Sequence, residues 1–173
     1  MKKFAVALLF CGVSAFAATI SYTTTGVFTL SGTGTETAGG STISFTGASG
    51  TIGLPTYTSL GTFTESSLGT GTFSDTFTLT VSSGGTGSFS TAISGTVTGN
   101  SSGILVSFNP TSQVIGGDLW TLSPASFGLN NPTVLAGQTS IQAFVSAPEP
   151  ASLGLLGASL AGLGIAFRRR RAA

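Results

Sequence analysis

A regular alternation of apolar and small polar residues sets the strongest limit on how this chain can fold. From residue 73 to residue 81, every odd position except 75 is Phe, Leu or Val, and every even position is Thr or Ser. Residues 89–97 follow the same parity, with Phe89, Ile93 and Val97 at odd positions. A period of two places these side chains on alternate faces of a β-strand, so that one face is buried and the other is wetted. Linkers can share a composition rich in Gly, Ser and Thr, but they do not keep such a period.

Weaker forms of the pattern predict more strands, which turn signals separate. These strands are expected at residues 19–22, 27–30, 43–45, 57–63, 104–108, 119–122 and 141–145. Turn signals with Gly or Asn occur at residues 32–34, 39–40, 84–85, 99–100, 109–110 and 130–132. Short strands at this spacing are typical of an antiparallel sandwich or barrel. We therefore expect residues 18–147 to form an all-β antiparallel β-sandwich, with a jelly-roll arrangement as one form of it.

Two places fit this pattern poorly. Residues 33–40 contain few apolar side chains and are expected to form a mobile loop. Asp75 falls on the apolar parity of its strand, which a strand end or a β-bulge at that position would explain.

The N-terminus reads as an export signal. Lys2 and Lys3 precede ten apolar residues, 4–13, and Ala15 and Ala17 supply the small residues that signal peptidase requires before its cut. Residues 1–17 are therefore predicted to be a signal peptide that is removed after Ala17. Cys11, the only cysteine, lies inside this segment, so the mature chain contains no disulfide.

The C-terminus combines three features in a fixed order. Pro148, Glu149 and Pro150 come first, and the uncharged apolar residues 151–167 follow. As a helix these residues would cover about 25 Å, the short end of what spans a hydrocarbon core about 30 Å thick. Four arginines then end the apolar run: Arg168, Arg169, Arg170 and Arg171. Such a cluster stops translocation and stays in the cytoplasm, so one C-terminal transmembrane helix is predicted, within a tail of residues 148–173.

This tail resembles the PEP-CTERM sorting tail of bacterial exported proteins. The resemblance covers residues 148–171 and implies a sorting signal; it assigns no activity, and the rest of the chain inherits nothing from it. It assigns Pro148, Glu149 and Pro150 as the recognition tripeptide, and the arginine cluster as the cytoplasmic stop. It also implies an exosortase-like membrane enzyme that cleaves or transfers the chain near the tripeptide, in bacteria that make exopolysaccharide.

The charge of residues 18–147 argues against nucleic-acid binding. All lysines and arginines lie in the two terminal segments, and the chain has no histidine. The acidic residues of the domain are Glu36, Glu65, Asp75 and Asp118, which give a side-chain charge of −4. A domain without cationic side chains cannot neutralise phosphates, so nucleic-acid binding is not expected.

Catalytic groups are equally scarce. Serine is abundant, but a serine nucleophile needs a base, and the domain has no histidine or lysine. Glu65 and Asp75 are the nearest pair for glycoside hydrolysis, but both lie near predicted turns, where solvated carboxylates are usual. Asp118 follows two glycines, and one carboxylate makes a weak calcium site. We expect no enzyme, no metal and no cofactor.

These observations favour a non-enzymatic exported protein. It would be anchored transiently in the inner membrane and then sorted to the cell surface or to an extracellular biofilm matrix. Its partners would be signal peptidase and the exosortase-like enzyme. The alternative is a carbohydrate-binding module at the same location, contacting exopolysaccharide. Trp120 discriminates the two, because an exposed indole would favour the module, although Trp120 is expected in the core. The uncharged segments 77–81 and 104–108 further predict self-association from edge strand to edge strand.

Overall fold

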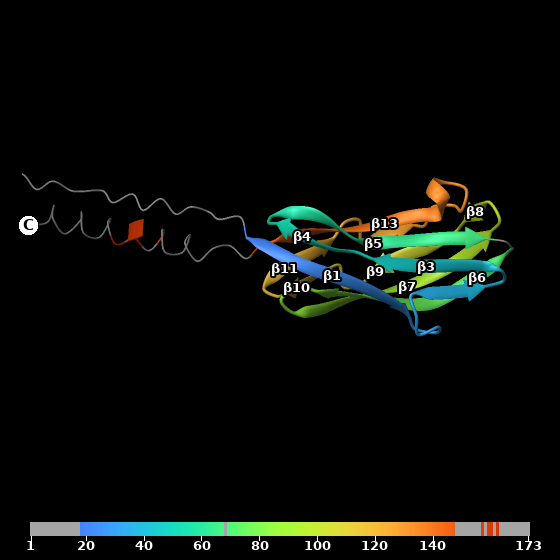
Figure 1. Cartoon of the computed structure of the whole chain (residues 1–173), viewed down its shortest axis with the longest axis horizontal. Coiled ribbons are helices and arrows are strands. Elements are labelled where there is room, and N and C mark those ends of the chain that lie inside the picture. Colours follow the sequence, from blue (N-terminus) through green and yellow to red (C-terminus); the bar gives the residue numbers. More distant parts are fainter. Residues whose placement is uncertain (1–17, 68, 148–156, 158, 161, 163–173) are drawn as a thin grey trace, which may run out of the picture.

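The computed structural model describes residues 18–67, 69–147, 157, 159, 160 and 162. Residues 18–147 form two curled antiparallel sheets that face each other in a sandwich-like arrangement (Figure 1). This confirms the all-β antiparallel prediction. Among the residues that the structure describes, no helix has the length and hydropathy needed to cross a membrane. The predicted span at residues 151–167 lies outside them except for Gly157, Ser159, Leu160 and Gly162, which are helical.

Sheet A contains seven strands. They are β1 (Thr19–Phe28), β4 (Ser49–Gly53), β6 (Gly71–Ser82), β7 (Thr86–Thr98), β8 (Ser101–Ser102), β9 (Leu105–Phe108) and β12 (Ser126–Gly128). Their order across the sheet is β12-β9-β7-β6-β1-β4, and β8 pairs with the end of β7.

Sheet B contains six strands. They are β2 (Thr35–Ala38), β3 (Ser41–Gly47), β5 (Thr56–Ser67), β10 (Ser112–Ile115), β11 (Asp118–Leu122) and β13 (Gln138–Ser146). Their order is β10-β11-β13-β5-β3-β2, and a short 3-10 turn, η1 (Leu135–Gly137), leads into β13.

A cluster of phenylalanine rings fills the space between the sheets. Phe28 and Phe77 come from sheet A, Phe45 and Phe63 come from sheet B, and neighbouring ring centroids lie 4.8–5.2 Å apart. Gly26 leaves room for these rings, since a Cβ there would overlap the rings of Phe77 and Phe45. The odd-numbered apolar residues of β6 therefore point inward, as the alternation predicts.

Two strand predictions need correction, and four strands lie in segments where none was predicted: β4, β8, β10 and β12. The separate strands predicted at residues 19–22 and 27–30 are one strand, β1, because the β-branched threonines 23–25 continue the ladder and Gly26 is covered by aromatic rings. The loop predicted at residues 33–40 contains β2, which pairs with β3 through the Gly39–Gly40 turn. Its polar residues are compatible with a strand because β2 lies at the edge of sheet B.

The edge-strand prediction is also wrong for the segments it named. Residues 77–81 belong to β6, which pairs with β1 on one side and β7 on the other. Residues 105–108 form β9, which lies between β7 and β12. The outermost strands are β12, β4, β10 and β2, each of three to five residues. Short edges of this kind limit pairing between molecules.

Side chains join the two sheets at both seams. Thr24 of β1 donates from Oγ1 to the Leu60 carbonyl of sheet B at 2.6 Å, and its Oγ1 accepts the Ala48 N–H at 2.7 Å. At the opposite seam, the Gln113 amide of β10 binds the backbone of Ser88 in β7. Its Oε1 accepts the Ser88 N–H at 3.1 Å, and its Nε2 donates to the Ser88 carbonyl. Gln113 therefore extends the β7 ladder beyond the stretch 91–94 that β9 covers.

Gln113→Ala is expected to destabilise the domain by about 1 kcal/mol, because it removes two hydrogen bonds from a partly exposed backbone. The exposed Gln142 on the outer face of β13 provides the control, and Gln142→Ala should change stability by less than about half a kcal/mol. Urea unfolding of both variants measures the difference. Equal midpoints for the two would show that Gln113 does not hold the seam.

Candidate functional site

The sequence-predicted processing residues lie outside the described part of the chain. These are Ala15, Ala17, Pro148, Glu149, Pro150, Arg168, Arg169, Arg170 and Arg171. The structure does describe the residues where the folded domain begins and ends, Ala18 and Ala147. Their surroundings show what a cut on either side would leave behind.

Both ends of the domain attach to the same turn. The Leu54 N–H donates to the Ala18 carbonyl at 2.9 Å, just before β1 begins. Thr56, two residues after Leu54, pairs with Val145 near the end of β13. Ala18 and Ala147 therefore lie at one end of the sandwich, where β1 begins and β13 finishes (Figure 1). We call this the processing end.

The last strand stays paired with a neighbouring strand up to its final residue. β13 lies between β11 and β5, and its final residue, Ser146, still pairs with Leu119. Ala147 is exposed, and Pro148 follows it. Proline lacks an N–H for the ladder and is not tolerated inside a central strand, so the sequence itself limits how far β13 can extend. The tripeptide begins only two residues beyond the folded sheet.

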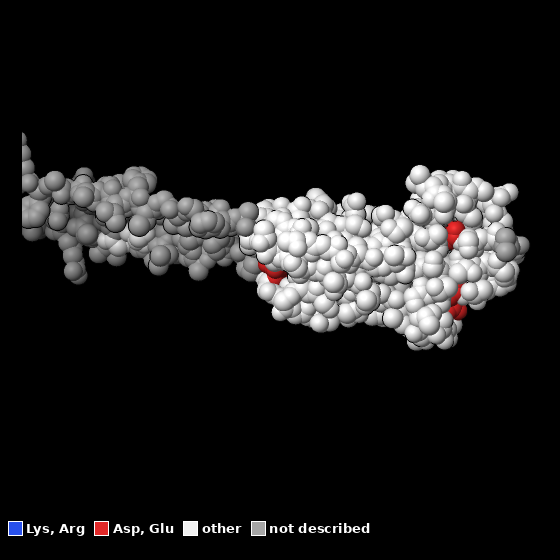
Figure 2. Space-filling model, in the orientation of Figure 1, with Lys and Arg blue, Asp and Glu red and all other residues white. Residues whose placement is uncertain are grey.

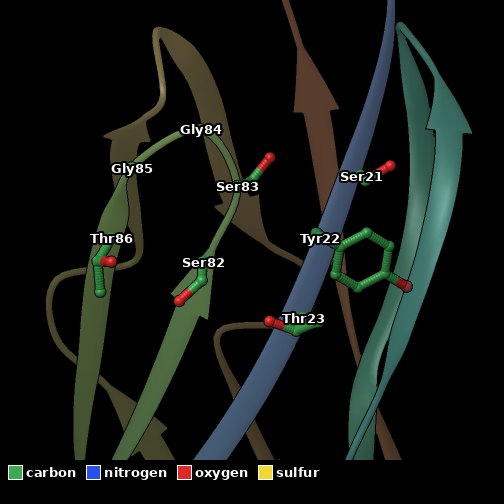
Figure 3. Close-up of a pocket in the computed structure, with 8 residues that line it drawn as sticks. All are labelled: Ser21, Tyr22, Thr23, Ser82, Ser83, Gly84, Gly85 and Thr86. Atoms are coloured by element: carbon green, nitrogen blue, oxygen red, sulfur yellow. The ribbon is translucent and has the colours of Figure 1, made fainter.

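A shallow pocket of about 340 Å³ opens at this end, between the start of β1 and the β6–β7 turn (Figure 3). Its lining is uncharged and consists of Ser21, Tyr22, Thr23, Ser82, Ser83, Gly84, Gly85 and Thr86. The Tyr22 ring is turned toward the interior, where its hydroxyl lies 2.7 Å from both the Thr58 hydroxyl and the Ser59 carbonyl. Apart from Tyr22, whose hydroxyl is bound in the interior, the pocket presents small hydroxyl groups and backbone.

Acidic side chains are few on the surface of the domain. Figure 2 shows isolated red atoms and no blue ones on the described residues. All four carboxylates of residues 18–147 are described, and among the described residues no group of three or more His, Cys, Asp or Glu side chains could hold a metal ion. Asp118 lies at the start of β11, directly after the Gly116–Gly117 turn.

Glu65 does not lie in solvent, contrary to the sequence prediction. Its side chain is 1% exposed on the inner face of β5. Oε2 accepts the Ser102 hydroxyl at 2.6 Å, and Oε1 is buried without a hydrogen-bond partner among the described atoms. Burial raises the pKa of the Glu65 carboxyl, and the Ser102 bond offsets only part of that effect.

Asp75 has a different set of partners. Its carboxylate accepts the Leu30 N–H at 3.1 and 3.3 Å and the Thr76 N–H at 2.6 Å. It lies in the middle of β6, where the β6–β7 register is continuous, so neither a strand end nor a bulge explains its parity. The explanation lies in the neighbouring strand. β1 stops at Phe28, and the carboxylate binds the turn that follows. Glu65 and Asp75 thus bind separate groups from opposite sheets.

Trp120 is a core residue, as predicted. Its indole is fully buried and packs edge-on against Tyr22, with ring centroids 5.6 Å apart. Its Nε1 has no hydrogen-bond partner among the described residues. Trp120 therefore offers no surface for stacking a sugar.

Among the residues that the structure describes, the exposed aromatic is Tyr57, which the sequence prediction did not separate from the core strand. Tyr57 and Phe63 are both odd-numbered, but Gly61 pairs with Ile141 and Ser59 pairs with Gln142, so Leu60 is one extra residue in β5. Leu60 and Gly61 are both buried as a result, and the strand changes parity there. Tyr57 therefore faces outward while Phe63 faces inward. A glycine inside a strand pattern often marks a bulge, so Gly61 is the sequence feature that could have predicted this change of face.

Comparison with known proteins identifies only the C-terminal part of the chain. The PEP-CTERM protein-sorting motif matches residues 146–171. No curated protein and no solved structure matched the chain. The match begins at the last residue of β13, so the motif and the folded domain meet at Ser146 without a linker. The chain therefore carries a PEP-CTERM sorting motif, which implies export, processing by an exosortase and sorting to the cell surface.

Proposed function

We propose that this is a non-enzymatic exported protein whose β domain is delivered to the cell surface or the extracellular polysaccharide matrix. Signal peptidase removes residues 1–17, and the C-terminal helix then holds the chain in the inner membrane. An exosortase-like enzyme acts at Pro148–Pro150 and frees residues 18–147 or transfers them to an acceptor. The role of the domain is structural.

One observation carries this proposal. The sorting motif begins where the central strand β13 ends, at the end of the sandwich that also holds Ala18. A cut near the tripeptide leaves every strand pair of β13 in place, so the domain keeps its core after processing. This arrangement suits a cargo that must stay folded after it leaves the membrane.

The surroundings of the acidic residues support the non-enzymatic part. Glu65 is closed off from solvent, and the Asp75 carboxylate is occupied by backbone N–H groups. A general acid or base must reach the substrate within hydrogen-bond distance, and neither carboxylate is free to do so.

The carbohydrate-binding alternative is weaker with Trp120 buried. The remaining exposed aromatic, Tyr57, packs against Phe144 with an angle of 53° between the rings. Such a tilted pair does not present the flat surface on which a sugar face stacks. We therefore do not adopt this second function.

Intact-mass measurement of the protein from the cell surface tests the proposed function. The expected chain begins at Ala18 and ends between Ala147 and Ala151. Glu149→Gln should leave the tail attached, whereas Glu36→Gln, which changes an acid outside the motif, should be processed normally. A surface chain that retains Phe167 and the arginines would contradict the proposal.

A further inference from the structure

Four apolar or aromatic side chains gather on the outer face of sheet B at the processing end. Tyr57 is 62% exposed, Val114 is 68% exposed and Leu119 is 43% exposed, and Phe144 is half-buried beside them. We call this set the tail-end surface.

Strand pairing makes these side chains neighbours. Val114 of β10 lies opposite Leu119 of β11, and Leu119 lies opposite Ser146 of β13. Phe144, two residues before Ser146, points to the same face and lies opposite Tyr57 of β5. The Tyr57 and Phe144 rings are 5.0 Å apart. The surface therefore crosses four adjacent strands next to the last residues of the domain.

On β5 and β13, the rest of the outer face of sheet B is polar. Beyond Tyr57, the outward residues of β5 are Ser59, Thr62 and Thr64, and those of β13 beyond Phe144 are Gln142, Ser140 and Gln138. Among the outward residues of these two strands, the apolar side chains are thus confined to the end that carries Ala147, whereas the exposed Leu30, Val134 and Leu135 lie in turns at the opposite end. Solvation alone does not explain such a segregation along one sheet face.

Chain length shows what lies within reach of this end. Four residue steps separate Ala147 from Ala151, the first residue of the predicted span, so the two are at most about 14 Å apart. The headgroup layer on each side of a bilayer is roughly 5–8 Å thick. While the tail is inserted, the processing end cannot leave the membrane surface by more than a short distance.

We propose that the tail-end surface rests on the non-cytoplasmic leaflet of the membrane while the tail is inserted. This inference rests on the tail insertion in the proposed function. Tyrosine suits the interface because its ring is apolar and its hydroxyl is polar, and Val114 and Leu119 add apolar contact. The charged groups at this end are Asp118 and, after signal removal, the α-amino group of Ala18, and residues 18–147 contain no cationic side chain. The contact therefore depends on apolar side chains, and it holds the tripeptide at a fixed depth for a membrane-embedded enzyme.

Site-specific fluorescence tests this contact in the tailed chain after signal removal, residues 18–173. This chain contains no cysteine, so single substitutions can be labelled with an environment-sensitive dye. Val114→Cys reports on the tail-end surface, and Leu160→Cys reports on tail insertion. Leu105→Cys is the matched control, because Leu105 is 53% exposed and pairs with Ser94, far along β7 from the processing end. The chains are inserted in phosphatidylcholine vesicles with or without brominated lipid, which quenches dyes that touch the bilayer.

The expected result is strong quenching at positions 160 and 114 and little at position 105. Adding Tyr57→Ser and Leu119→Ser should reduce the quenching at position 114 severalfold and leave that at position 160 unchanged. Quenching at 160 without quenching at 114 would overturn the inference and leave the proposed function intact. Equal quenching at 114 and 105 would also overturn it. A blue shift at 114 that depends on protein concentration and not on lipid would assign the surface to a second copy instead. Absence of quenching at 160 would overturn the tail insertion, and the inference with it.

Discussion

Leu79→Asp is expected to abolish cooperative unfolding of the domain. Leu79 is fully buried in the middle of β6, opposite Gly26 of β1 and Phe89 of β7. A carboxylate there would face the phenylalanine core, in a domain without a cationic side chain to pair with it. An unpaired buried charge costs several kcal/mol, against a total stability of about 5–15 kcal/mol. Circular dichroism during heating should show no sharp transition.

Thr78→Asp is the matched control. Thr78 is the preceding residue and lies on the outer face, between Val27 and Ser90. The same carboxylate is solvated there, so stability should change by about half a kcal/mol at most. A thermal transition that is retained in Leu79→Asp, or lost equally in both variants, would contradict the assignment of faces in β6.

Glu65→Gln is expected to stabilise the domain at neutral pH by about 1–3 kcal/mol, the range for a poorly compensated buried polar group. The Glu65 carboxylate has one hydrogen bond, from Ser102, and one buried oxygen without a partner among the described atoms. Glutamine keeps the acceptor for Ser102 and carries no charge. The gain should appear as a higher melting temperature at pH 7.

The pH dependence gives a second readout of the same substitution. Burial raises the pKa of Glu65 in the folded state above its ordinary value of 4.5. Between these two pKa values the folded state binds more protons than the unfolded state, so stability falls as pH rises through that interval. Below the ordinary pKa the carboxyl is neutral in both states and the penalty is absent. Glu65→Gln should remove this decline.

Asp118→Asn controls for the loss of one negative charge, because Asp118 is only half-buried at the start of β11. This variant should keep the decline of stability with rising pH. Melting temperatures from pH 4 to pH 8 for the three proteins decide the matter. If the melting temperature of the wild-type domain depends on pH in the same way as that of Glu65→Gln, Glu65 is not a buried acid.

The amino-acid sequence alone determined the all-β class and the inner faces of the strands with the most regular alternation. The Thr–apolar alternation of β6 and β7 is a local pattern, and each strand needs only its own side chains to define an inner face. The tail was equally readable, because its tripeptide, apolar run and arginines are consecutive and the matching motif depends on that order.

Only the tertiary structure decided which strands are neighbours and where single residues end up. Leu60 is an extra residue in β5, next to Gly61, and it turns Tyr57 outward; this bulge is defined by the register with β13. Glu65 is buried because Ser102 arrives from the other sheet, and Asp75 is partnered because β1 stops beside it. Ala18 and the end of β13 lie at the same end of the sandwich because they pair with Leu54 and Thr56, respectively. Strand pairing brings together residues far apart in the chain, and no local pattern encodes that choice.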